Sequence, residues 1–412
     1  MVEYRPIPNR RATFHEYRQY SFGAERGRPA YDPDEHDTPR ALLGNRRGLF
    51  VDGAADNADP RCVCRHYWLR ATVRGESFPV AGLASVATPP EYRRQGHVRQ
   101  LLARSLAEYR ERGDRFALLW PFKHRFYRKY GWETTNQIAI HEFEPAVLAS
   151  VAARDDDDRD GALRRLDADE YETLEPAYER HADRYSLALE RDESWWRHRV
   201  FGGDDVDPFV AAYEREDRVA GYLVYTIDDE QGTRVLNVSE LIADDHDAFR
   251  ALLSFCYAHG SQVDRVRLRL PTNAPVRETV RDPDEVETTV ETGPMGRIVD
   301  VERTLSALSY PDCEVTLTLA VDDPLADWNA DTFELDVAGG DGICKRVDDN
   351  RESAVADADA TLDIAALSQL SIGSRSARGL ERTNRLETNQ STELSTLAAV
   401  FPETSVYLGE YF

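Results

Sequence analysis

Three arginines gather around one glycine in the stretch PPEYRRQGHVRQLL (residues 89–102). They are Arg93, Arg94 and Arg99, and Gly96 lies among them just before a helix-like pattern. The first turn of a helix presents N–H groups without partners and a partial positive charge, and a glycine there allows close approach of an anion. Arginines add bidentate donors suited to phosphate oxygens. The stretch therefore predicts a site for a phosphate-bearing ligand, although an ordinary solvated turn would also fit it.

The common motifs for other phosphate ligands and for hydrolysis are absent from the sequence. There is no GxxxxGK[ST] for a nucleoside triphosphate, no GxGxxG after a strand for a dinucleotide, and no GxSxG elbow. Coenzyme A is a phosphate-bearing molecule that fits what remains.

The charge balance restricts the possible partners. With 75 acidic and 51 basic side chains the formal net charge is -24, so the surface as a whole repels nucleic acid and anionic membranes and favours cationic ligands. Only Lys123, Lys129 and Lys345 are lysines. So many acids with so little lysine indicate a salt-adapted cytoplasm, such as that of a halophilic archaeon.

Metal binding, disulfides and membrane insertion are not expected. The cysteines are scattered and lack zinc-ligand spacing, which favours reduced, structural thiols: Cys62, Cys64, Cys256, Cys313 and Cys344. No apolar run approaches the length that spans a bilayer, and the N-terminus carries no leader-like segment. We therefore expect a cytoplasmic protein.

A chain of 412 residues should form two or three domains. The segments CVCRHYWLRATV and FPVAGLASVAT alternate as strands do, with a turn between them at Arg74 and Gly75. A helical face follows over residues 98–109 and ends at Gly113, and FALLW (residues 116–120) reads as a buried strand. This order predicts an α/β unit that closes near residue 150, with the charged run RDDDDRD (residues 154–160) as a linker or helix start.

The next segment repeats the same order more faintly. Strands are expected at residues 219–227, 234–242 and 265–271, with a helix at residues 247–259. Where the first copy has RRQGHVR, the second has ADDHD, and aspartates at a helix start stabilise the helix but repel phosphate. We expect the second copy to have lost the anion site.

The remaining chain, residues 294–412, combines alternating strands with later helices and shows no catalytic motif of its own. It reads as a small α+β domain. In the second copy the paired Trp195 and Trp196 are interpreted as core residues rather than ligands.

Several motifs together resemble a known family. The strand GLASVAT, RxxGxx opening a helix, the strand FALLW and then FYRKYGWE are similar to GNAT-type N-acetyltransferases. More narrowly, PPEYRRQGHVRQLL with PFKHRFYRKYGWE resembles the enhanced intracellular survival (Eis) type. That resemblance implies two tandem GNAT modules, the second degenerate, followed by a sterol carrier protein-like domain, with boundaries at residues 1–150, 151–293 and 294–412. Val98 departs from the glycine or alanine of many GNAT loops.

The resemblance also implies the residues that hold acetyl-CoA. The main chain of Val86, Ala87 and Thr88 would pair with the pantetheine arm. The pyrophosphate would be held largely by main-chain N–H groups of Arg94, Gln95, Gly96, His97, Val98 and Arg99. Phe122 and Lys123 would complete the wall of the cofactor site. The side chain of His97 is expected to be a bystander.

Two catalytic groups follow from the same resemblance. Tyr127 matches the general acid that protonates the departing thiolate, and a tyrosine with an ordinary pKa near 10 is protonated at neutral pH. The terminal carboxylate of Phe412 would act as general base. The structural alternatives are a tyrosine that only packs among aromatic neighbours and a frayed C-terminus.

The resemblance thus implies an acetyl-CoA-dependent N-acetyltransferase that transfers the acetyl group directly to a primary amine of a cationic small molecule or a lysine side chain. It also implies a homo-hexamer. From the charge, the cysteine spacing and the lack of a long apolar run we expect no nucleic acid, membrane or metal as partner. Two alternatives stay open: a non-catalytic GNAT-derived scaffold or binding protein, and an acyltransferase that uses a different acyl-CoA.

Overall fold

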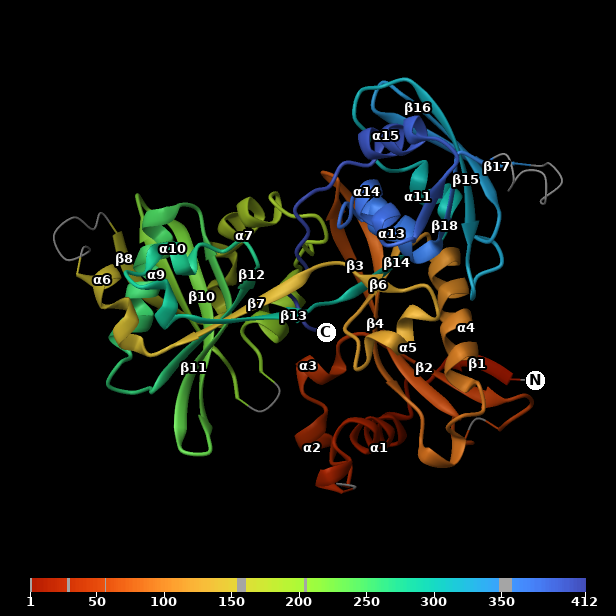
Figure 1. Ribbon diagram of the computed structural model, residues 1–412. Helices are drawn as coiled ribbons and strands as arrows, with labels where there is room; N and C mark the ends of the chain where they lie inside the picture. The colour runs from red at the N-terminus through yellow and green to blue at the C-terminus, as the bar shows by residue number, and fades with distance from the viewer. Residues whose placement is uncertain (1, 28–29, 56, 154–160, 204–205, 348–357) are drawn as a thin grey trace. The chain divides into compact units, whose positions relative to one another are not determined.

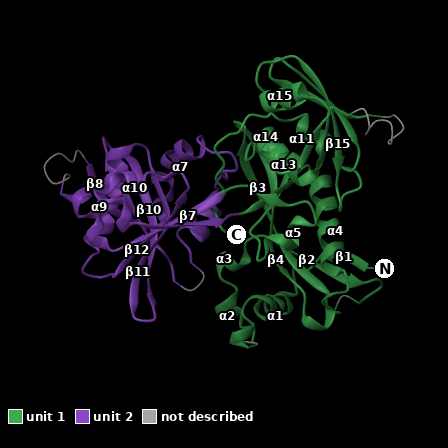
Figure 2. Ribbon diagram, viewed as in Figure 1, with its two compact units in different colours: residues 1–136, 294–412 green, residues 137–293 purple. Residues whose placement is uncertain are grey.

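The computed structural model describes residues 2–27, 30–55, 57–153, 161–203, 206–347 and 358–412. The chain folds into two units, Met1–Asn136 with Pro294–Phe412 and Gln137–Gly293 (Figure 2). The first unit is therefore built from both ends of the chain. The linker predicted at residues 154–160 lies outside the described residues.

A seven-stranded sheet organises the first part of the first unit, in the order β1-β2-β3-β4-β5-β14-β6 (Figure 1). Its strands are β1 (Val2–Pro6), β2 (Asn45–Val51), β3 (Cys62–Val73), β4 (Glu76–Ala87), β5 (Phe116–Leu119), β6 (Glu133–Thr134) and β14 (Met295–Ile298). The β3–β4 hairpin and the parallel neighbour β5 confirm the predicted strands. Strand β14 comes from far along the chain, yet it pairs antiparallel with both β5 and β6.

Helices cover both faces of this sheet. The helices of this part of the unit are α1 (Arg11–Phe22), α2 (Pro33–His36), α3 (Pro39–Leu42), α4 (His97–Arg112) and α5 (His124–Arg128), of which α4 and α1 pack on opposite faces. The predicted helical face of α4 is buried through Leu101, Leu102, Leu106 and Tyr109, and the helix ends at the left-handed Gly113. On the other face, α1 packs through residues 14 and 17 against β2 and β3.

The third region of the chain completes the first unit. Its five-stranded sheet has the order β17-β16-β15-β18-β19. Its elements are α11 (Val301–Leu305), β15 (Val315–Asp322), β16 (Thr332–Ala338), β17 (Asp341–Arg346), β18 (Ala360–Asp363), α13 (Ile364–Ile372), α14 (Ala377–Arg382), β19 (Leu386–Thr388) and α15 (Ser391–Val400). Every residue of α13 is buried, and this helix packs against β14 and β6. The third region and the first α/β region therefore share one packed unit.

The second unit repeats the α/β plan around its own sheet, ordered β13-β7-β12-β11-β10-β9-β8. Its strands are β7 (Gln137–Phe143), β8 (Gly161–Leu166), β9 (Phe209–Arg215), β10 (Arg218–Glu230), β11 (Thr233–Ala243), β12 (Arg265–Pro271) and β13 (Glu287–Thr292). Its helices are α6 (Ala149–Ala152), α7 (Glu175–Ala182), α8 (Glu193–Trp195), α9 (His246–Ala258) and α10 (Val276–Thr279). The antiparallel β10–β11 hairpin, α9 and the parallel β12 confirm the predicted second copy. Trp195 and Trp196 are buried, as predicted.

The division between the units differs from the boundary expected near residue 150. Strand β7 lies before that boundary, but it pairs antiparallel with β12 and β13 of the second sheet. Conversely, β14 follows the second unit and joins the first sheet. Strand periodicity indicates where a strand lies in the sequence but not which sheet it joins, so these two placements depend on tertiary pairing. No helix in the described ranges is both long and apolar enough to cross a bilayer.

A buried ion pair anchors β14. The side chains of Arg297 and Asp323 are fully buried and form a salt bridge. Arg297 also donates to the carbonyl oxygen of Tyr130, and Asp323 accepts from the side-chain amide of Asn329 at 3.0 Å. The pair therefore joins the first sheet, the segment after α5 and the third region.

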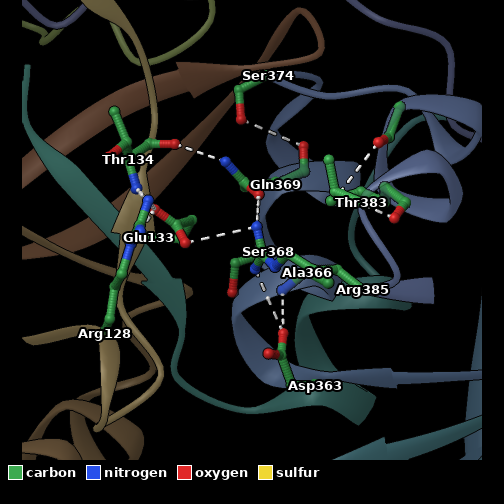
Figure 3. Close-up of polar contacts among 12 residues, drawn as sticks. Arg128, Glu133, Thr134, Asp363, Ala366, Ser368, Gln369, Ser374, Thr383 and Arg385 are labelled. Carbon is green, nitrogen blue, oxygen red and sulfur yellow. Dashed lines mark hydrogen bonds and ion pairs between the residues drawn. The ribbon is translucent and has the colours of Figure 1, made fainter. Parts of the chain in front are cut away.

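A second polar network links the same regions (Figure 3). Glu133 of β6 accepts from Arg128 of α5 at 2.9 Å and forms an ion pair with Arg385 of the third region at 3.4 Å. Gln369 of α13 donates to the carbonyl oxygen of Thr134 at 2.8 Å, and its side-chain oxygen accepts from Arg385 at 2.6 Å. The position of α5 is thus tied to the third region through hydrogen bonds.

Removing the charge of Asp323 should destabilise the first unit. We expect Asp323→Asn to lower the free energy of unfolding by about 3–5 kcal/mol, because Arg297 would remain buried without a counter-ion. Urea denaturation at constant salt measures this change. The matched control Asp284→Asn removes an acid from the exposed pair with Arg277 in the second unit and should cost about 1 kcal/mol or less. Equal effects of the two substitutions would contradict the role of the buried pair.

Candidate active site

Strand β4 separates from β5 at the edge where the predicted cofactor residues lie. The parallel pairing joins residues 80–83 of β4 to residues 116–119 of β5, and β5 ends there while β4 continues to Ala87. A register shift in the β3–β4 pairing and a left-handed Ser85 (φ 52°) mark a bulge at the same place. The end of β4, which includes Val86, therefore has no β5 neighbour and can pair with an extended ligand.

The start of α4 is open to an anion. Gly96 caps the helix in a left-handed conformation (φ 80°), which favours glycine, and no side chain accepts a hydrogen bond at this end. The first turn contains no acidic residue, so the N–H groups of His97, Val98 and Arg99 face no competing carboxylate of their own helix. Gly96 is exposed, as are Arg94 and Gln95 before it. This geometry fits the pyrophosphate cradle that the sequence predicts.

The three arginines of the motif have different surroundings. Arg93 donates to the carbonyl oxygen of Thr88 at 2.8 Å and so closes the loop. Arg99 reaches the carbonyl oxygen of Pro324 in the third region at 3.1 Å. Arg94 is exposed, left-handed (φ 59°) and without an ion pair among the described residues. Arg94 is thus the arginine of this loop with the fewest competing contacts.

The equivalent helix of the second unit is capped by its own acids. Asp245 accepts from the backbone N–H of Ala248 at 2.9 Å and pairs with Arg215. Asp244 pairs with Arg180 at 2.9 Å and also with Arg218. The carboxylates therefore occupy the positions that an incoming phosphate would need, in agreement with the prediction for this copy.

Tyr127 lies on α5, beyond the end of β5, with 4% of its surface exposed. Its ring contacts the rings of Phe122, Phe126 and Trp132 at centroid distances of 5.7, 5.1 and 6.3 Å. Burial raises the pKa of Tyr127 above its ordinary value, which keeps the hydroxyl protonated. Within the described residues the hydroxyl makes no hydrogen bond, so its proton is available to a ligand.

The C-terminal tail is docked against the first sheet. The backbone N–H of Leu408 donates to the side-chain oxygen of Asn136 at 3.1 Å, and the indole of Trp120 donates to the carbonyl oxygen of Glu410 at 2.6 Å. The ring of Phe412 lies so close to Gly82 that a Cβ atom there would stand 2.8 Å from a ring carbon. Only 7% of Phe412 is exposed, and the frayed alternative does not describe this terminus.

The other predicted residues take different positions. Phe122 and Lys123 are exposed between β5 and α5, and 58% of the Phe122 surface is accessible. The side chains of Val86, Ala87 and Thr88 are buried; Ala87 is paired with Val63 of β3, and the carbonyl oxygen of Thr88 already accepts from Arg93. The sequence did not indicate Trp120 or Gly82 as docking points for the tail. A glycine inside a strand can mark a close approach, and Gly82 carries that signal.

Comparisons with known proteins agree with this arrangement. Residues 10–135 and residues 187–298 each match an acetyltransferase (GNAT) domain family, and residues 301–409 match a sterol carrier protein domain family. The chain is a tandem GNAT acyltransferase with a C-terminal sterol carrier domain.

Relatives of this acyltransferase align over nearly the whole chain. An uncharacterized N-acetyltransferase of Streptomyces avermitilis is 29% identical, over 84% of each protein. The N-acetyltransferase Eis of Mycobacterium tuberculosis is 26% identical, over 90% of each. Among solved structures, Eis1 from Mycobacterium abscessus superposes with a TM-score of 0.73 at 25% identity over 100% of each chain. A probable N-acyltransferase of Enterococcus faecalis gives 0.85 at 20% identity, again over 100% of each, and shows the same fold.

An acid placed at the first turn of α4 should separate ligand binding from stability. We expect His97→Asp to leave the stability of the acyltransferase unchanged or higher by up to about 1 kcal/mol, because a carboxylate suits a helix N-terminus. The same charge should weaken coenzyme A binding by about tenfold or more through repulsion of its phosphates. Calorimetric titration and thermal melting measure the two effects.

His246→Asp is the matched control, because His246 holds the same first position in α9 of the second unit. It should leave coenzyme A binding unchanged. Equal losses in both variants would show that the start of α4 is not the cradle.

Proposed function

We propose that the protein is an acetyl-CoA-dependent N-acetyltransferase that acts on a primary amine of a small molecule or a lysine side chain by direct transfer. The observation that carries the proposal is the docked C-terminus. It holds Phe412 against the middle of β4, the strand whose far end forms the predicted cofactor edge. The relatives named N-acetyltransferases support the same reaction.

The residues present fit coenzyme A. The uncapped start of α4 offers N–H groups to the pyrophosphate, with Arg94 beside it, and the end of β4 offers main-chain groups of residues 86–88 to the pantetheine arm. Phe122 and Lys123 lie exposed near Tyr127 and would form the adjoining wall. When bound, acetyl-CoA supplies the acetyl group as a thioester.

Two groups of this chain would move the protons. The carboxylate of Phe412 accepts the proton that the attacking amine must lose. Tyr127 keeps its hydroxyl proton because burial raises its pKa, and it gives this proton to the departing sulfur. The two roles require no metal-binding residue.

The alternatives differ in what they require of the site. A non-catalytic scaffold would need neither an unbonded tyrosine hydroxyl nor an uncapped helix start, so these two features favour the enzyme. A different acyl-CoA would bind the same cradle and differ only in the depth of the acyl pocket. Comparison of acetyl-CoA with longer acyl-CoA thioesters measures that preference.

We also propose a cytoplasmic, salt-adapted homo-oligomer, a hexamer by its resemblance to Eis-type enzymes. The formal net charge of -24 supports the salt adaptation. Light scattering after size exclusion, at low and at high salt, gives the oligomeric state and its salt dependence.

Loss of the Tyr127 hydroxyl should affect turnover rather than binding. We expect Tyr127→Phe to lower kcat by about 10²- to 10⁴-fold, the usual contribution of a general acid, with little change in the affinity for acetyl-CoA. Because burial raises the pKa of Tyr127 above its ordinary value near 10, the wild-type kcat should show no fall from loss of this proton between pH 7 and 9. Thiol release gives kcat of the variant and the pH dependence of kcat of the wild type. A Tyr127→Phe enzyme with the kcat of the wild type would contradict the assignment.

Deletion of Phe412 should reduce kcat by at least about tenfold while acetyl-CoA binding persists, since the carboxylate would move by one residue. Phe412→Leu is the control: it keeps the terminal carboxylate in place and loses only part of the ring packing on Gly82. It should retain most of the turnover. Unchanged turnover in the truncated protein would remove Phe412 from the mechanism.

A further inference from the structure

Two arginines lie directly opposite each other on neighbouring strands. Arg46 of β2 and Arg65 of β3 are partners in the antiparallel register. Their guanidinium carbons lie 5.2 and 5.1 Å from the ring centroid of Phe14 on α1. Like charges in this position destabilise a strand pair. Such an arrangement calls for an interaction that compensates the charge.

Neither arginine has a carboxylate partner among the described residues. Arg46 donates to the carbonyl oxygen of Ala41 at 2.9 Å, and Arg65 donates to the hydroxyl of Tyr67 at 3.2 Å. The Nε atoms of both arginines are buried without a hydrogen-bond partner. Asp37, the acid that influences the charge of Arg46, binds Arg11 at 2.7 Å instead.

Burial raises the free-energy cost of leaving these guanidinium groups without a hydrogen-bond acceptor. Only 7% of the Arg65 surface is exposed. Burial and the charge of Arg65 lower the pKa of Arg46 to about 10. Buried charges in proteins are normally paired, and buried donors are normally bonded. The two side chains therefore have the properties of an anion site.

Arg65 of this pair is connected to the proposed catalytic terminus through Tyr67. Alternation along β3 places Arg65, Tyr67 and Leu69 on one face of the sheet. The ring of Tyr67 meets that of Phe412 at a centroid distance of 5.7 Å, and its hydroxyl accepts from Arg65. A Cβ atom at Gly82 would touch both Phe412 and Leu69. One tyrosine side chain thus separates the guanidinium of Arg65 from the terminal residue.

We propose that Arg65, assisted by Arg46, binds a carboxylate of the acceptor, so that the substrate is an amine that also carries a carboxylate, as an amino acid does. The proposal rests on the proposed acetyl transfer for the role of the amine. A planar guanidinium matches the two oxygens of a carboxylate. A phosphate would match as well, but it would bring a second negative charge to a place that only the Tyr67 side chain separates from the terminal residue Phe412, so we favour the singly charged group. The acidic surface still attracts the ammonium end of such a substrate.

Three amines that differ only at the carboxylate test the proposal. Lysine carries it, lysinamide replaces it by an amide, and 1,5-diaminopentane lacks it. We expect kcat/KM for lysine, followed by thiol release at one fixed salt concentration, to exceed the other two values by about tenfold or more, the usual effect of a charge-assisted hydrogen bond. Arg65→Gln should abolish this preference by raising the KM for lysine alone, and Arg65→Lys should keep part of it.

Arg104→Gln is the matched control, because Arg104 is exposed on α4 and the substitution changes the net charge equally. It should leave the preference intact. Circular dichroism shows whether each variant is folded. Equal kcat/KM values for the three amines in the wild type, or parallel losses for all three in Arg65→Gln, would overturn the proposal.

Calorimetric titration of the full chain with acetate, and separately with inorganic phosphate, gives a measurement without turnover. Acetate binding that is lost in Arg65→Gln supports the carboxylate site, even when no amine is acetylated and the proposed transfer reaction itself fails. Phosphate binding in preference to acetate, or acetate binding unchanged in Arg65→Gln, would count against it.

Discussion

The buried ion pair between Arg297 and Asp323 holds together the parts of the molecule on which the site depends. Arg297 stands on β14, the strand that lies between β5 and β6 in the first sheet. Its guanidinium binds the carbonyl oxygen of Tyr130 and lies 4.9 Å from the ring centroid of Trp132. These two residues follow Tyr127 in the chain. The position of Tyr127 therefore depends on a strand that comes after the second unit and on an acid of the third region.

This dependence gives the sterol carrier region a role within the first unit. Arg74, at the turn between β3 and β4, donates to the carbonyl oxygens of Leu370, Ser371 and Pro402 in that region. The chain then returns through its last residues to β4, where Phe412 docks. Hydrogen bonds from Trp120 to Glu410 and from Leu408 to Asn136 hold this tail in place. The first α/β region thus obtains the strand β14, part of the support of α5 and the docked residue Phe412 from residues beyond 293.

The sequence predicted local features well because their signals are local. The apolar face of α4 and its end at Gly113 follow from helical spacing and from the left-handed preference of glycine. The acidic cap of α9 was likewise predicted from the aspartates that precede this helix in the sequence. Strand exchange through β7 and β14 was not predicted, because alternation marks a strand in the sequence but does not identify its partners in a sheet. Residue type alone also did not distinguish a packed tyrosine from a catalytic one at Tyr127, and only the family resemblance pointed to Phe412.

The buried and half-buried arginines of the first unit show how a strongly acidic protein places part of its positive charge. A guanidinium has five N–H donors, and burial is tolerated where acceptors meet them. Arg297 has a carboxylate and a carbonyl oxygen, and Arg74 has at least three carbonyl oxygens. Arg65 has one tyrosine hydroxyl and an aromatic ring.

In our proposal the acceptor missing at the Nε atom of Arg65 comes from the substrate, whose carboxylate supplies two oxygens at once. The acidic exterior repels a simple anion, and the two arginines, Arg46 and Arg65, repel a simple cation. They become complementary for a substrate that carries both charges, because the exterior attracts its ammonium group while Arg65 orients its carboxylate beside Tyr67.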